Sequence, residues 1–427
     1  MATERTSARH LLIFEPDPRG HAAEWIEHLA RQVACRGLPE KLSLAVPVAL
    51  ADEVISGGPE PWRDSLRVLP LRRWETALCN SRVLAISGLA RWWVMRRSLA
   101  HADADHGLFL SLDHLTLPLA LGLRFGGRQV SGILFRPSVH YATARGAPRR
   151  FAERIRELRK AILYPATLAN PAVQALRSLD PYFPAYAAAH YRHAEKVRAV
   201  ADPVHPRAGD PDDAPPWREA VPPERIVFLL FGVLGRRKGI LALLEALRRL
   251  EPRCASAIAV CIAGQIDRAV AGRVHEALAE IADLRPELWL QVEDRRLSTA
   301  ELAAAIARAD VILAPYQRFV GSSGVLLWAA KSGKPVITQD YGLLGRLVDD
   351  FRLGMAVDAT DPSEIAAAIA ATVRRGPGAL ADAAGMQRFL DGHSGERFAA
   401  GVLDGIQPAV AAHPISPAEF EERAATD

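Results

Sequence analysis

The feature that most constrains the fold of this chain is the alternation of short apolar runs with longer amphipathic stretches, which is most regular in the second half. Runs such as RIVFLLFG, SAIAVCIAG and DVILAPY have the length and residue types of buried strands. The stretch DRAVAGRVHEALAEIADL, after the second run, has the spacing of an amphipathic helix. Strands that are apolar on both faces and alternate with helices are typical of a parallel sheet covered on both sides. The second half is therefore predicted to be a doubly wound α/β domain.

The first half shows the same alternation with less regularity. A chain of 427 residues exceeds what one core usually serves, and the segment DPVHPRAGDPDDAPPWREAVPPER has the Pro-rich, acidic composition of a linker. One long helix is expected over roughly residues 74–100. The predicted strands are HLLIF, KLSLAVPVAL, SLRVLPL, HGLFLSLD, QVSGILFRPSVHY, AVQALRSLD and KVRAVAD. The predicted organisation is two doubly wound Rossmann-like domains that face a central cleft, at residues 1–205 and 225–392, with a linker at 206–224 and a helix and tail at 393–427.

Composition argues against several classes of function. The net charge is +4, but the sequence lacks the interleaved basic and aromatic residues of single-stranded nucleic-acid binders, so no nucleic-acid partner is expected. The four cysteines have neither metal-ligand spacing nor a disulfide framework, which fits a reducing cytoplasm. The N-terminus lacks the apolar core of a signal peptide, and no run is long enough to span a bilayer.

Two loops of the second half could hold an anion, because ligands of open parallel sheets bind beyond the carboxyl ends of the strands. In FGVLGRRKG, three cations (Arg236, Arg237 and Lys238) stand where a helix is expected to begin near Lys238. Cations at a helix N-terminus oppose the helix dipole, and a bound anion would relieve that conflict. The loop GSSG, residues 321–324, offers serine hydroxyls and free amides before another helix. A solvated turn and an ordinary serine cap are the alternatives, but two such loops in one domain favour a diphosphate held between them.

Three loops of the first half also follow predicted strands: Arg19–His21, Leu112–His114 and Arg136–Tyr141. His140 can shuttle a proton or donate to a developing negative charge, although it could also be a hydrogen-bonded loop residue. Gly20 and His21 could approach a phosphate or an acceptor, but a short turn explains them equally well.

Two other segments are interpreted as structural. Asp103–Asp105 is read as a solvated helix end and not as a metal site, so no metal is expected. Trp92 and Trp93, with arginines around them, could rest on an anionic membrane, but buried tryptophans with surface arginines are favoured.

The order of elements in the second half resembles the nucleotide-sugar-binding domain of group 1 retaining glycosyltransferases, which have the GT-B fold and include many bacterial polysaccharide enzymes. The resemblance covers roughly residues 226–371. The segments FGVLGRRKG, CIAGQ, ELAAAIARADVILAPY, a glycine loop with its helix, SGKPVITQDYGLLGRLV, RLGMAV and DPSEIAAAI follow in family order. The first half resembles the family more loosely, through RGH and SVHY.

The resemblance implies which residues bind the substrates. Lys238 matches the lysine that meets the donor diphosphate, and the backbone of residues 323–326 matches amides that bind the distal phosphate. His140 matches a first-domain histidine beside the transferred sugar. Together with the loops above, this gives a predicted catalytic set of His140, Lys238 and Arg237 and an acceptor-side set of Gly20, His21 and Asp113. The predicted donor-binding residues are Gly232, Gly235, Arg236, Gly264, Gln265, Ser322, Ser323, Gly324, Val325 and Leu326.

The chain departs from the family pattern at three positions. Val233 stands where a cation usually follows the first glycine, and Arg236 or Arg237 could replace it. Many relatives carry two glutamates eight positions apart around the glycine loop, where this chain has Val320 and Trp328. Its contacts with the sugar and ribose must therefore differ, with Ser322 and Ser323 as substitutes.

The function implied is a glycosyltransferase that moves a sugar from a nucleotide-diphosphate donor to a glycan, glycolipid or small-molecule acceptor without a metal or other cofactor, and with retention. It would be cytoplasmic or peripheral at the inner membrane, where it could contact a lipid-linked acceptor. The alternative is a catalytically silent GT-B scaffold that binds a nucleotide or a protein partner. An epimerase of related fold is a third hypothesis, which the scarcity of acidic candidates disfavours.

Overall fold

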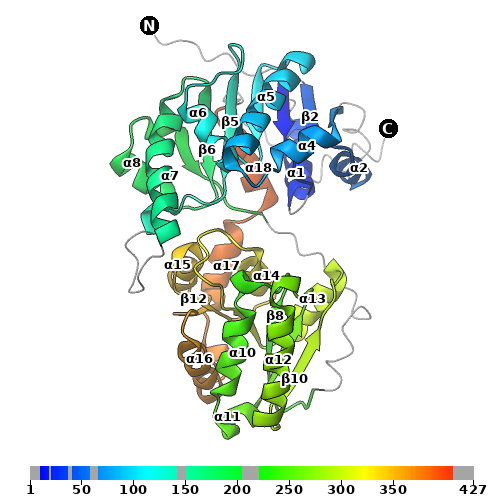
Figure 1. The fold of residues 1–427 in the computed structure, drawn as a ribbon, viewed down its shortest axis with the longest axis vertical. Coiled ribbons are helices and arrows are strands. Elements are labelled where there is room, and N and C mark those ends of the chain that lie inside the picture. The colour runs from blue at the N-terminus through cyan, green and yellow to red at the C-terminus, as the bar shows by residue number, and fades with distance from the viewer. Residues whose placement is uncertain are drawn as a thin grey trace. The chain divides into compact units, whose positions relative to one another are not determined.

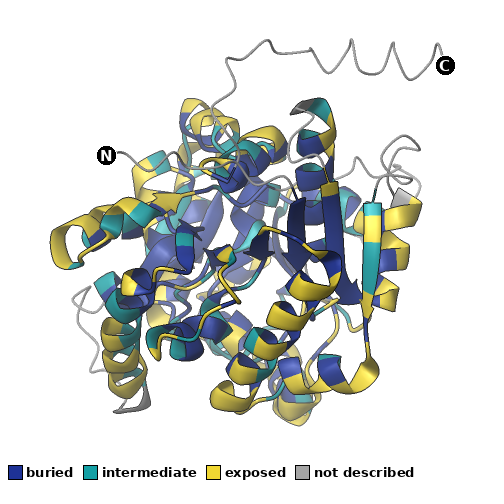
Figure 2. Cartoon of the chain, turned by 90° about the horizontal axis from the view of Figure 1, so that it is seen from above, coloured by how far each residue is buried: buried dark blue, intermediate teal, exposed yellow. Residues whose placement is uncertain are grey.

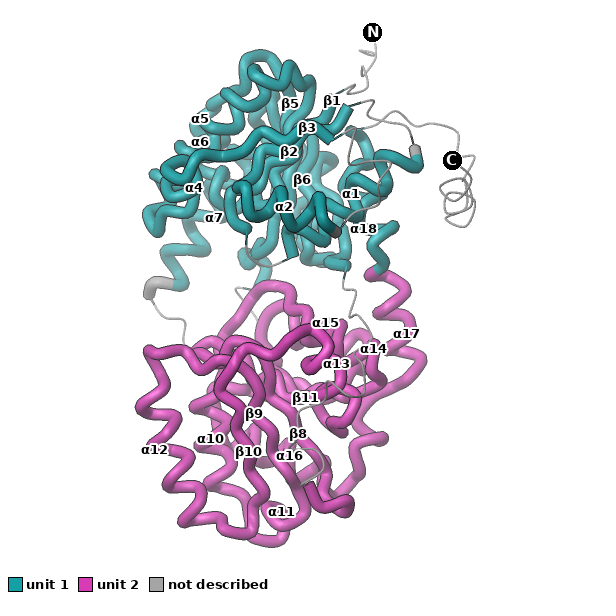
Figure 3. The backbone as a smooth tube through the Cα atoms, turned by 90° about the vertical axis from the view of Figure 1, so that its right-hand side faces the viewer, with its two compact units in different colours: residues 1–142, 147–203, 394–427 teal, residues 143–146, 204–393 magenta. Residues whose placement is uncertain are grey.

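The structure is a computed structural model that describes residues 10–18, 21–36, 41–57, 66–141, 151–203 and 221–406. The chain forms two compact units, which Figure 3 shows in different colours. Unit 1 comprises residues 1–142, 147–203 and 394–427, and unit 2 comprises residues 143–146 and 204–393.

Unit 1 is built on a parallel sheet of seven strands in the order β3-β2-β1-β4-β5-β6-β7 (Figure 1). Successive residues of β1 face opposite sides of this sheet, as strand geometry requires. Leu11 and Ile13 pack with α1, α2 and α18, whereas Leu12 and Phe14 pack with α5, α6, α7 and α8. The strands are β1 (His10–Phe14), β2 (Lys41–Pro47), β3 (Leu66–Leu71), β4 (His106–Phe109), β5 (Gln129–Leu134), β6 (Val173–Ser178) and β7 (Val197–Ala199).

The helices of unit 1 cover both faces of this sheet, and Figure 2 shows that helices of the protein are buried on one side and exposed on the other. The α-helices are α1 (Ala22–Arg36), α2 (Val48–Gly57), α4 (Arg73–Cys79), α5 (Leu84–Ala102), α6 (Thr116–Ala120), α7 (Phe151–Ala169), α8 (Phe183–His190) and α18 (Gly395–Leu403). Three short 3-10 turns are η1 (Asp113–Leu115), η2 (Ser138–Tyr141) and η3 (Ala194–Lys196).

The single helix predicted over residues 74–100 is wrong, because the chain forms α4 and α5 with a break between them. Asn80 ends α4, and its side-chain amide donates to the Pro16 carbonyl at 2.9 Å. The Cys79 carbonyl accepts hydrogen bonds from the Ser87 hydroxyl and from Arg91 Nε, at 2.5 and 3.0 Å. Partners from outside the helix thus replace the hydrogen bonds that a continuous helix would make.

Two further expectations about the first half need correction. The strand predicted over KLSLAVPVAL ends at Pro47, and α2 begins at Val48. Proline has no amide proton for a sheet ladder, which helps to explain this limit. The prediction of buried tryptophans is wrong for Trp93, whose side chain is exposed, and Trp92 is half-buried.

The acidic segment at the end of α5 is a helix end, as expected. Asp103 follows α5 in the left-handed conformation (φ 54°), and its exposed carboxylate lies 3.3 Å from Arg128. Asp105 has a structural role, because its carboxylate accepts the His10 amide at 2.9 Å. Among the described residues, no group of three or more His, Cys, Asp or Glu side chains could hold a metal ion.

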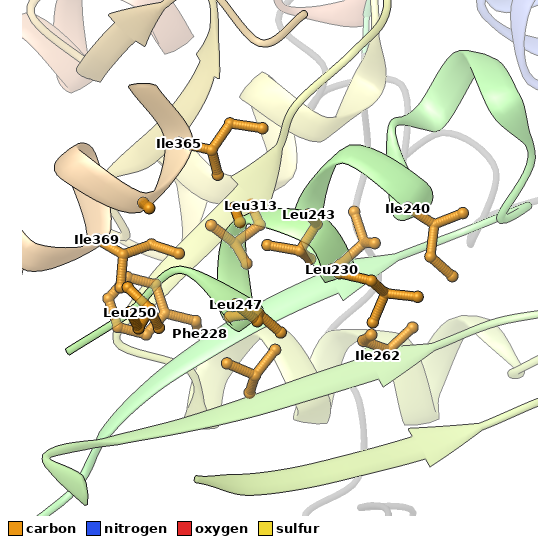
Figure 4. Packing of buried hydrophobic residues seen from close by; sticks show 14 of the residues in the cluster. Phe228, Leu230, Ile240, Leu243, Leu247, Leu250, Ile262, Leu313, Ile365 and Ile369 are labelled. Carbon is orange, nitrogen blue, oxygen red and sulfur yellow. The ribbon is translucent and has the colours of Figure 1, made fainter. Parts of the chain in front are cut away.

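Unit 2 is built on a parallel sheet of six strands in the order β10-β9-β8-β11-β12-β13. On one face, Phe228 and Leu230 pack against α10 and α16, and Figure 4 shows Leu243, Leu247 and Ile369 in this core. The order places β8 and β11 side by side, so the loops that follow these strands lie at the same edge. The strands are β8 (Ile226–Phe231), β9 (Ile258–Ala263), β10 (Trp289–Glu293), β11 (Val311–Ala314), β12 (Val336–Gln339) and β13 (Gly354–Val357).

In the described part of unit 2, five helices begin after a Ser or Asp whose side chain accepts an amide of the first turn. The Asp361 carboxylate accepts the Ser363 amide at 2.8 Å and opens α16, which confirms the helix start expected at Asp361 and Pro362. The helices are α10 (Ile240–Arg248), α11 (Pro252–Ser256), α12 (Arg268–Leu284), α13 (Thr299–Arg308), α14 (Gly324–Lys331), α15 (Gly342–Phe351), α16 (Pro362–Arg375) and α17 (Ala383–Asp391), with 3-10 turns η5 (Arg236–Lys238) and η6 (Pro377–Ala379).

The C-terminal helix α18 belongs to unit 1, although it follows unit 2 in the sequence. Phe398 packs against Trp25 of α1, with ring centroids 4.9 Å apart. The buried guanidinium of Arg177 on β6 donates from Nε to the Gly401 carbonyl at 2.7 Å. The chain thus returns to unit 1 after unit 2. In the part of the chain that the structure describes, no helix combines the length and apolarity needed to cross a membrane.

We predict that Gly88→Ala in α5 destabilises the protein by about 1–3 kcal/mol, although alanine favours a helix. A Cβ at Gly88 would lie 2.5 Å from the His114 carbonyl oxygen, and that backbone cannot move freely. Gly272→Ala in α12 is the matched control, because a Cβ there meets nothing within 4 Å. It should stabilise by about 0.5–1 kcal/mol. Urea unfolding of both variants measures the difference, and an equal gain from the two substitutions would contradict the packing described for α5.

Candidate functional site

The first loop of the candidate site joins β8 to α10. Gly232 follows β8 with φ 102°, and the three cations form the turn η5 before α10 begins at Ile240. The helix therefore starts two residues later than expected, because Gly239 adopts the left-handed conformation (φ 80°) between the turn and the helix. A Cβ at Gly239 would lie 1.8 Å from the Pro315 carbonyl oxygen, so only glycine permits this approach. The second glycine of the GRRKG motif brings the two loops together.

The second loop joins β11 to α14. Ser323 precedes the helix, and its hydroxyl accepts the Val325 amide at 3.4 Å, which is a long cap. The middle of the loop is held by Gln339, a buried residue at the end of β12. Its Oε1 accepts the Phe319 amide at 3.0 Å, and its Nε2 donates to the Tyr341 carbonyl at 2.6 Å.

A chain of hydrogen bonds connects these two loops through Tyr316. Lys238 Nζ donates to the Tyr316 hydroxyl at 2.9 Å, and that hydroxyl lies 2.7 Å from Ser323 Oγ. The Gln317 amide also donates to the Arg237 carbonyl at 2.9 Å. Lys238 and Ser323, which the sequence placed on separate loops, thus share one hydrogen-bonding partner. We name Lys238, Tyr316 and Ser323 the phenol bridge.

Aromatic rings lie beneath the cations of the first loop. Lys238 is only 7% exposed, and its Nζ lies 4.6 Å from the centroid of the Tyr316 ring. The Arg237 guanidinium lies 4.7 Å from the centroid of the Phe319 ring, which stacks on Tyr316. Burial by itself would raise the pKa of the Tyr316 phenol, but the Lys238 charge and the hydrogen bonds from Lys238 and Ser323 outweigh burial and lower it.

The loop after β9 supports the first loop. Gly264 has φ 140°, and a Cβ there would lie 2.0 Å from the Gly232 carbonyl oxygen. The Gln265 carbonyl accepts the Leu234 amide at 2.9 Å, while its side chain is exposed. Gly235 lies beside Asp267, whose carboxylate would be 3.4 Å from an added Cβ. These three predicted donor residues therefore shape the backbone that carries the cations.

The charge on the two loops is entirely positive. Residues 232–239 and 315–331 contain no Asp or Glu, and Val320 and Trp328 are both half-buried. The exposed arginines Arg236 and Arg237 add to the buried charge of Lys238. With helix α14 beginning at the same place, this arrangement favours binding of an anion.

In unit 1, His140 lies beside a buried carboxylate, Asp180, that the sequence did not indicate. His140 Nε2 lies 3.1 Å from Asp180 Oδ2, and both side chains are at least 94% buried. The Tyr141 hydroxyl donates to the same oxygen at 2.7 Å, and the Tyr182 amide donates to Oδ1 at 2.9 Å. Among the described residues, neither ring nitrogen of His140 has a hydrogen-bond partner, so Asp180 is a close neighbour of Nε2 and both nitrogens remain unpaired.

The remaining acceptor-side residues have different surroundings. Asp113 accepts the Phe135 amide at 2.8 Å and the Arg136 amide at 3.3 Å, so its carboxylate ties the β4 and β5 loops together. His21 is exposed at the start of α1, and its hydrogen bond with Glu24 raises the pKa of its imidazole. Gly20 lies outside the described residues. The described residues His21, Asp113 and His140 thus each have different neighbours: Glu24, the β5 loop amides and Asp180.

A second buried carboxyl, Glu15, also follows a strand of unit 1. Burial raises its pKa to about 7, against the opposing effect of Arg91. Arg91 is itself buried, and its Nη1 lies 3.9 Å from the Glu15 carboxylate. The rule that loops after strands matter most would have found both Glu15 and Asp180, since each comes one or two residues after a strand.

Comparison with known proteins decides the family of unit 2. Residues 225–375 match the sequence profile of the family described as "Glycosyl transferases group 1". This segment is a group 1 glycosyltransferase domain. No match was found among curated protein sequences. The group 1 domain contains all three members of the phenol bridge.

Solved structures extend the similarity to both units. A glycosyltransferase from Rickettsia africae is 14% identical with a TM-score of 0.61, over 93% of this chain and 97% of that one. The sucrose-phosphate synthase of Thermosynechococcus elongatus is 16% identical with a TM-score of 0.63, over 92% and 97%. Anabaena HepE in complex with UDP is 13% identical with a TM-score of 0.61, over 92% and 98%. At such identities the likeness shows the fold, and the chain has the GT-B fold of two Rossmann-like domains.

We predict that Tyr316→Phe loosens the loops of the group 1 domain, because the buried Lys238 ammonium loses the hydroxyl that accepts its hydrogen bond. Loss of a hydrogen bond to a charged group costs about 1.5–3 kcal/mol. Hydrogen exchange should therefore speed up in residues 236–244 and 323–330, measured by mass spectrometry.

A double-mutant cycle checks that the effect passes through Lys238. In a Lys238→Met background, Tyr316→Phe should change exchange much less than it does in the parent chain. Strictly additive effects of the two substitutions would contradict the bridge. Tyr341→Phe, in the loop after β12, is the control for loss of a tyrosine hydroxyl elsewhere in the domain.

Proposed function

We propose that this protein is a glycosyltransferase that moves a sugar from a nucleotide-diphosphate donor to an acceptor. The observation that carries the proposal is the phenol bridge, which joins two cationic strand-to-helix loops inside a group 1 domain. In this proposal the donor diphosphate binds at these loops, and residues of unit 1 serve the acceptor and the transferred sugar.

The cations act on the leaving group. In the transfer, the bond between the anomeric carbon and the diphosphate oxygen breaks, and its electron pair stays on that oxygen. Lys238, Arg236 and Arg237 and the amides at the start of α14 stabilise the negative charge that develops there. Because these groups supply the positive charge, the proposed mechanism needs no metal. The Tyr316 hydroxyl keeps Lys238 hydrogen-bonded before the diphosphate arrives and leaves it directed at the loop of Ser323.

His140 is proposed to serve the transferred sugar. The buried Asp180 carboxylate lies 3.1 Å from Nε2, and in this proposal an unpaired ring nitrogen accepts a hydrogen bond from a sugar hydroxyl or takes up a proton. Asp113 is proposed to position the β5 loop that leads to His140, since both of its oxygens accept amides of that loop.

The identity of the donor is the finer part of the proposal. HepE was solved with UDP and with UDP-glucose, which supports a donor of the same chemical class. Retention of configuration rests on the family resemblance alone. A glycan, glycolipid or small molecule is the proposed acceptor class. The four cysteines are free, which fits a reducing compartment such as the cytoplasm as the proposed location.

The absence of carboxylates at Val320 and Trp328 is the one observation that favours a second function. A GT-B scaffold that binds a nucleotide or partner without transferring a sugar would not need those glutamates. A thermal-shift panel of nucleoside diphosphates with a donor-hydrolysis assay separates the two. Stabilisation with hydrolysis supports the transferase, stabilisation alone supports a nucleotide-binding scaffold, and neither leaves only a scaffold for a protein partner.

We predict that Lys238→Ala lowers affinity for the nucleoside diphosphate that stabilises the protein best by about 1.5–3 kcal/mol, because a charged hydrogen bond to phosphate is lost. Isothermal titration calorimetry measures the change. Arg273→Ala, on an exposed face of α12, is the control for loss of one positive charge and should bind like the parent. An unchanged dissociation constant in Lys238→Ala would count against the diphosphate site.

We also predict that His140→Ala lowers donor turnover more than donor affinity. His140 belongs to unit 1, whereas the cations proposed to hold the diphosphate belong to unit 2. Steady-state hydrolysis and calorimetry give the two quantities separately. His101→Ala, an exposed histidine in the last turn of α5, serves as the control. An equal loss in both quantities would remove the special role of His140.

A further inference from the structure

Unit 1 carries a concentration of exposed apolar side chains that the proposed sugar transfer does not use. Seven of the fifteen large apolar side chains that are exposed in the described residues lie within residues 74–93, and each is between 40% and 56% exposed. Apolar surface gathered in this way marks an interaction site more often than the same residues scattered singly. We call them the α4–α5 surface: Trp74, Leu78, Val83, Leu84, Ile86, Leu89 and Trp93.

Helix spacing and ring contacts make this surface continuous. Ile86, Leu89 and Trp93 follow one another at i, i+3 and i+7, so they form one outward stripe of α5. Trp74 and Leu78 are one turn apart on α4, which packs beside α5 (Figure 1). The Trp74 and Trp93 rings meet across the two helices, with centroids 5.9 Å apart. The inward face of α5, with Val94, Met95 and Leu99, is already buried in the core. The outward stripe is therefore additional to what folding requires.

The charge around this surface has one sign. Residues 72–102, all of which the structure describes, contain six arginines and one acid, Glu75. Glu75 is fully buried and pairs with Arg97. Exposed arginines border the apolar residues at both ends: Arg72, Arg73, Arg82, Arg96 and Arg97.

Two of the arginines lie against tryptophans at this border. The Arg97 guanidinium is 5.2 Å from the Trp93 ring centroid, and Arg96 is 5.7 Å from that of Trp92. The Trp92 indole N–H donates to the Arg124 carbonyl at 3.1 Å. Tryptophan with one apolar and one polar side, next to arginine, is the combination found where protein meets the headgroup region of a bilayer.

We propose that the α4–α5 surface docks the protein on an anionic lipid membrane, with α4 and α5 lying along the headgroup boundary. The apolar stripe would enter the boundary, and the arginines would contact anionic headgroups. Charge complementarity favours this occupant over a second copy of the chain, because two copies of this face would bring their arginines together. The α4–α5 surface does not include the loops proposed to bind the nucleotide. A test of membrane binding therefore does not depend on the outcome for the proposed sugar transfer.

A second exposed apolar stripe of unit 1 lacks this combination. Ile155, Leu158 and Ile162 lie on α7, where Glu153 and Glu157 alternate with the cations. The α4–α5 surface has no exposed carboxylate and has tryptophans at its border, and an anionic bilayer matches both features.

The experiment measures binding of the purified full-length chain to vesicles of phosphatidylcholine alone and of phosphatidylcholine with phosphatidylglycerol. Co-sedimentation should show binding that depends on phosphatidylglycerol and weakens as salt rises, because the arginine contacts are screened. Quenching of tryptophan fluorescence by brominated lipid should accompany binding, since Trp74 and Trp93 would reach the acyl boundary.

Two sets of variants test the two parts of the surface. The pair Leu89→Glu and Trp93→Glu should weaken vesicle binding roughly tenfold or more, because both side chains leave the apolar boundary. The pair Arg82→Glu and Arg96→Glu should weaken it by roughly 25-fold or more, because each arginine removed from the anionic surface contributes about fivefold. Both pairs change exposed positions, and circular dichroism checks that the variants are folded.

Unit 2 supplies matched controls. Leu284→Glu replaces an exposed leucine at the end of α12, and the pair Arg268→Glu and Arg273→Glu reverses two exposed cations of the same helix. These controls should bind vesicles like the parent chain. Equal weakening by the controls would show that net charge and not this surface governs binding.

Three other results would overturn the proposal. They are no binding to either vesicle, equal binding to both vesicles without salt dependence, and a dimer in sedimentation velocity that Leu89→Glu with Trp93→Glu dissociates. The last result would assign the surface to a second copy of the chain.

Discussion

The hydrogen bond from Lys238 to the Tyr316 hydroxyl joins the two loops on which the site in unit 2 depends. A buried ammonium needs a hydrogen-bond partner, because the desolvation of an unpaired buried ion costs on the order of several kcal/mol. The two loops carry no carboxylate, so the phenol supplies that partner and passes the link on to Ser323. The close approach that makes this possible is set by Gly239 against Pro315. A ligand that offers anionic oxygens at the same place would satisfy the ammonium more strongly than a neutral phenol can.

Much of the fold could be predicted from periodicity because both sheets are parallel and buried on both faces. An apolar run such as IVFLLF is expected to be a buried strand in a protein of this size. The capping residues Asp361 and Pro362 mark a helix start directly. The break between α4 and α5 could not be read in this way. It depends on Asn80 reaching Pro16 and on Arg91 reaching Cys79, which are contacts between segments far apart or out of helical register. Exposure of Trp93 was missed for a related reason, since a tryptophan beside apolar residues has the same local pattern whether it is buried or exposed.

The candidate site was predictable where topology alone decided it. Loops after neighbouring parallel strands meet at one edge, so the positions of Lys238 and Ser323 followed from the order of strands and helices. The position of Tyr316, which connects them, could not be predicted in this way. A tyrosine just after a strand has the same local pattern as an ordinary core aromatic. Asp180 was missed similarly, because it lies 40 positions after His140 in the sequence, beyond α7 and β6. Gln339 also escaped notice, although it holds the loop between β11 and α14 from inside the sheet edge.

The most direct test of the central claim is an experimental structure of the protein with a bound nucleoside diphosphate. The account predicts that Lys238 Nζ and the first amides of α14 both lie within hydrogen-bonding distance of phosphate oxygens, with Lys238 turned from Tyr316 toward the ligand. A diphosphate bound elsewhere in the molecule, or one bound while Lys238 stays on the phenol, would contradict it.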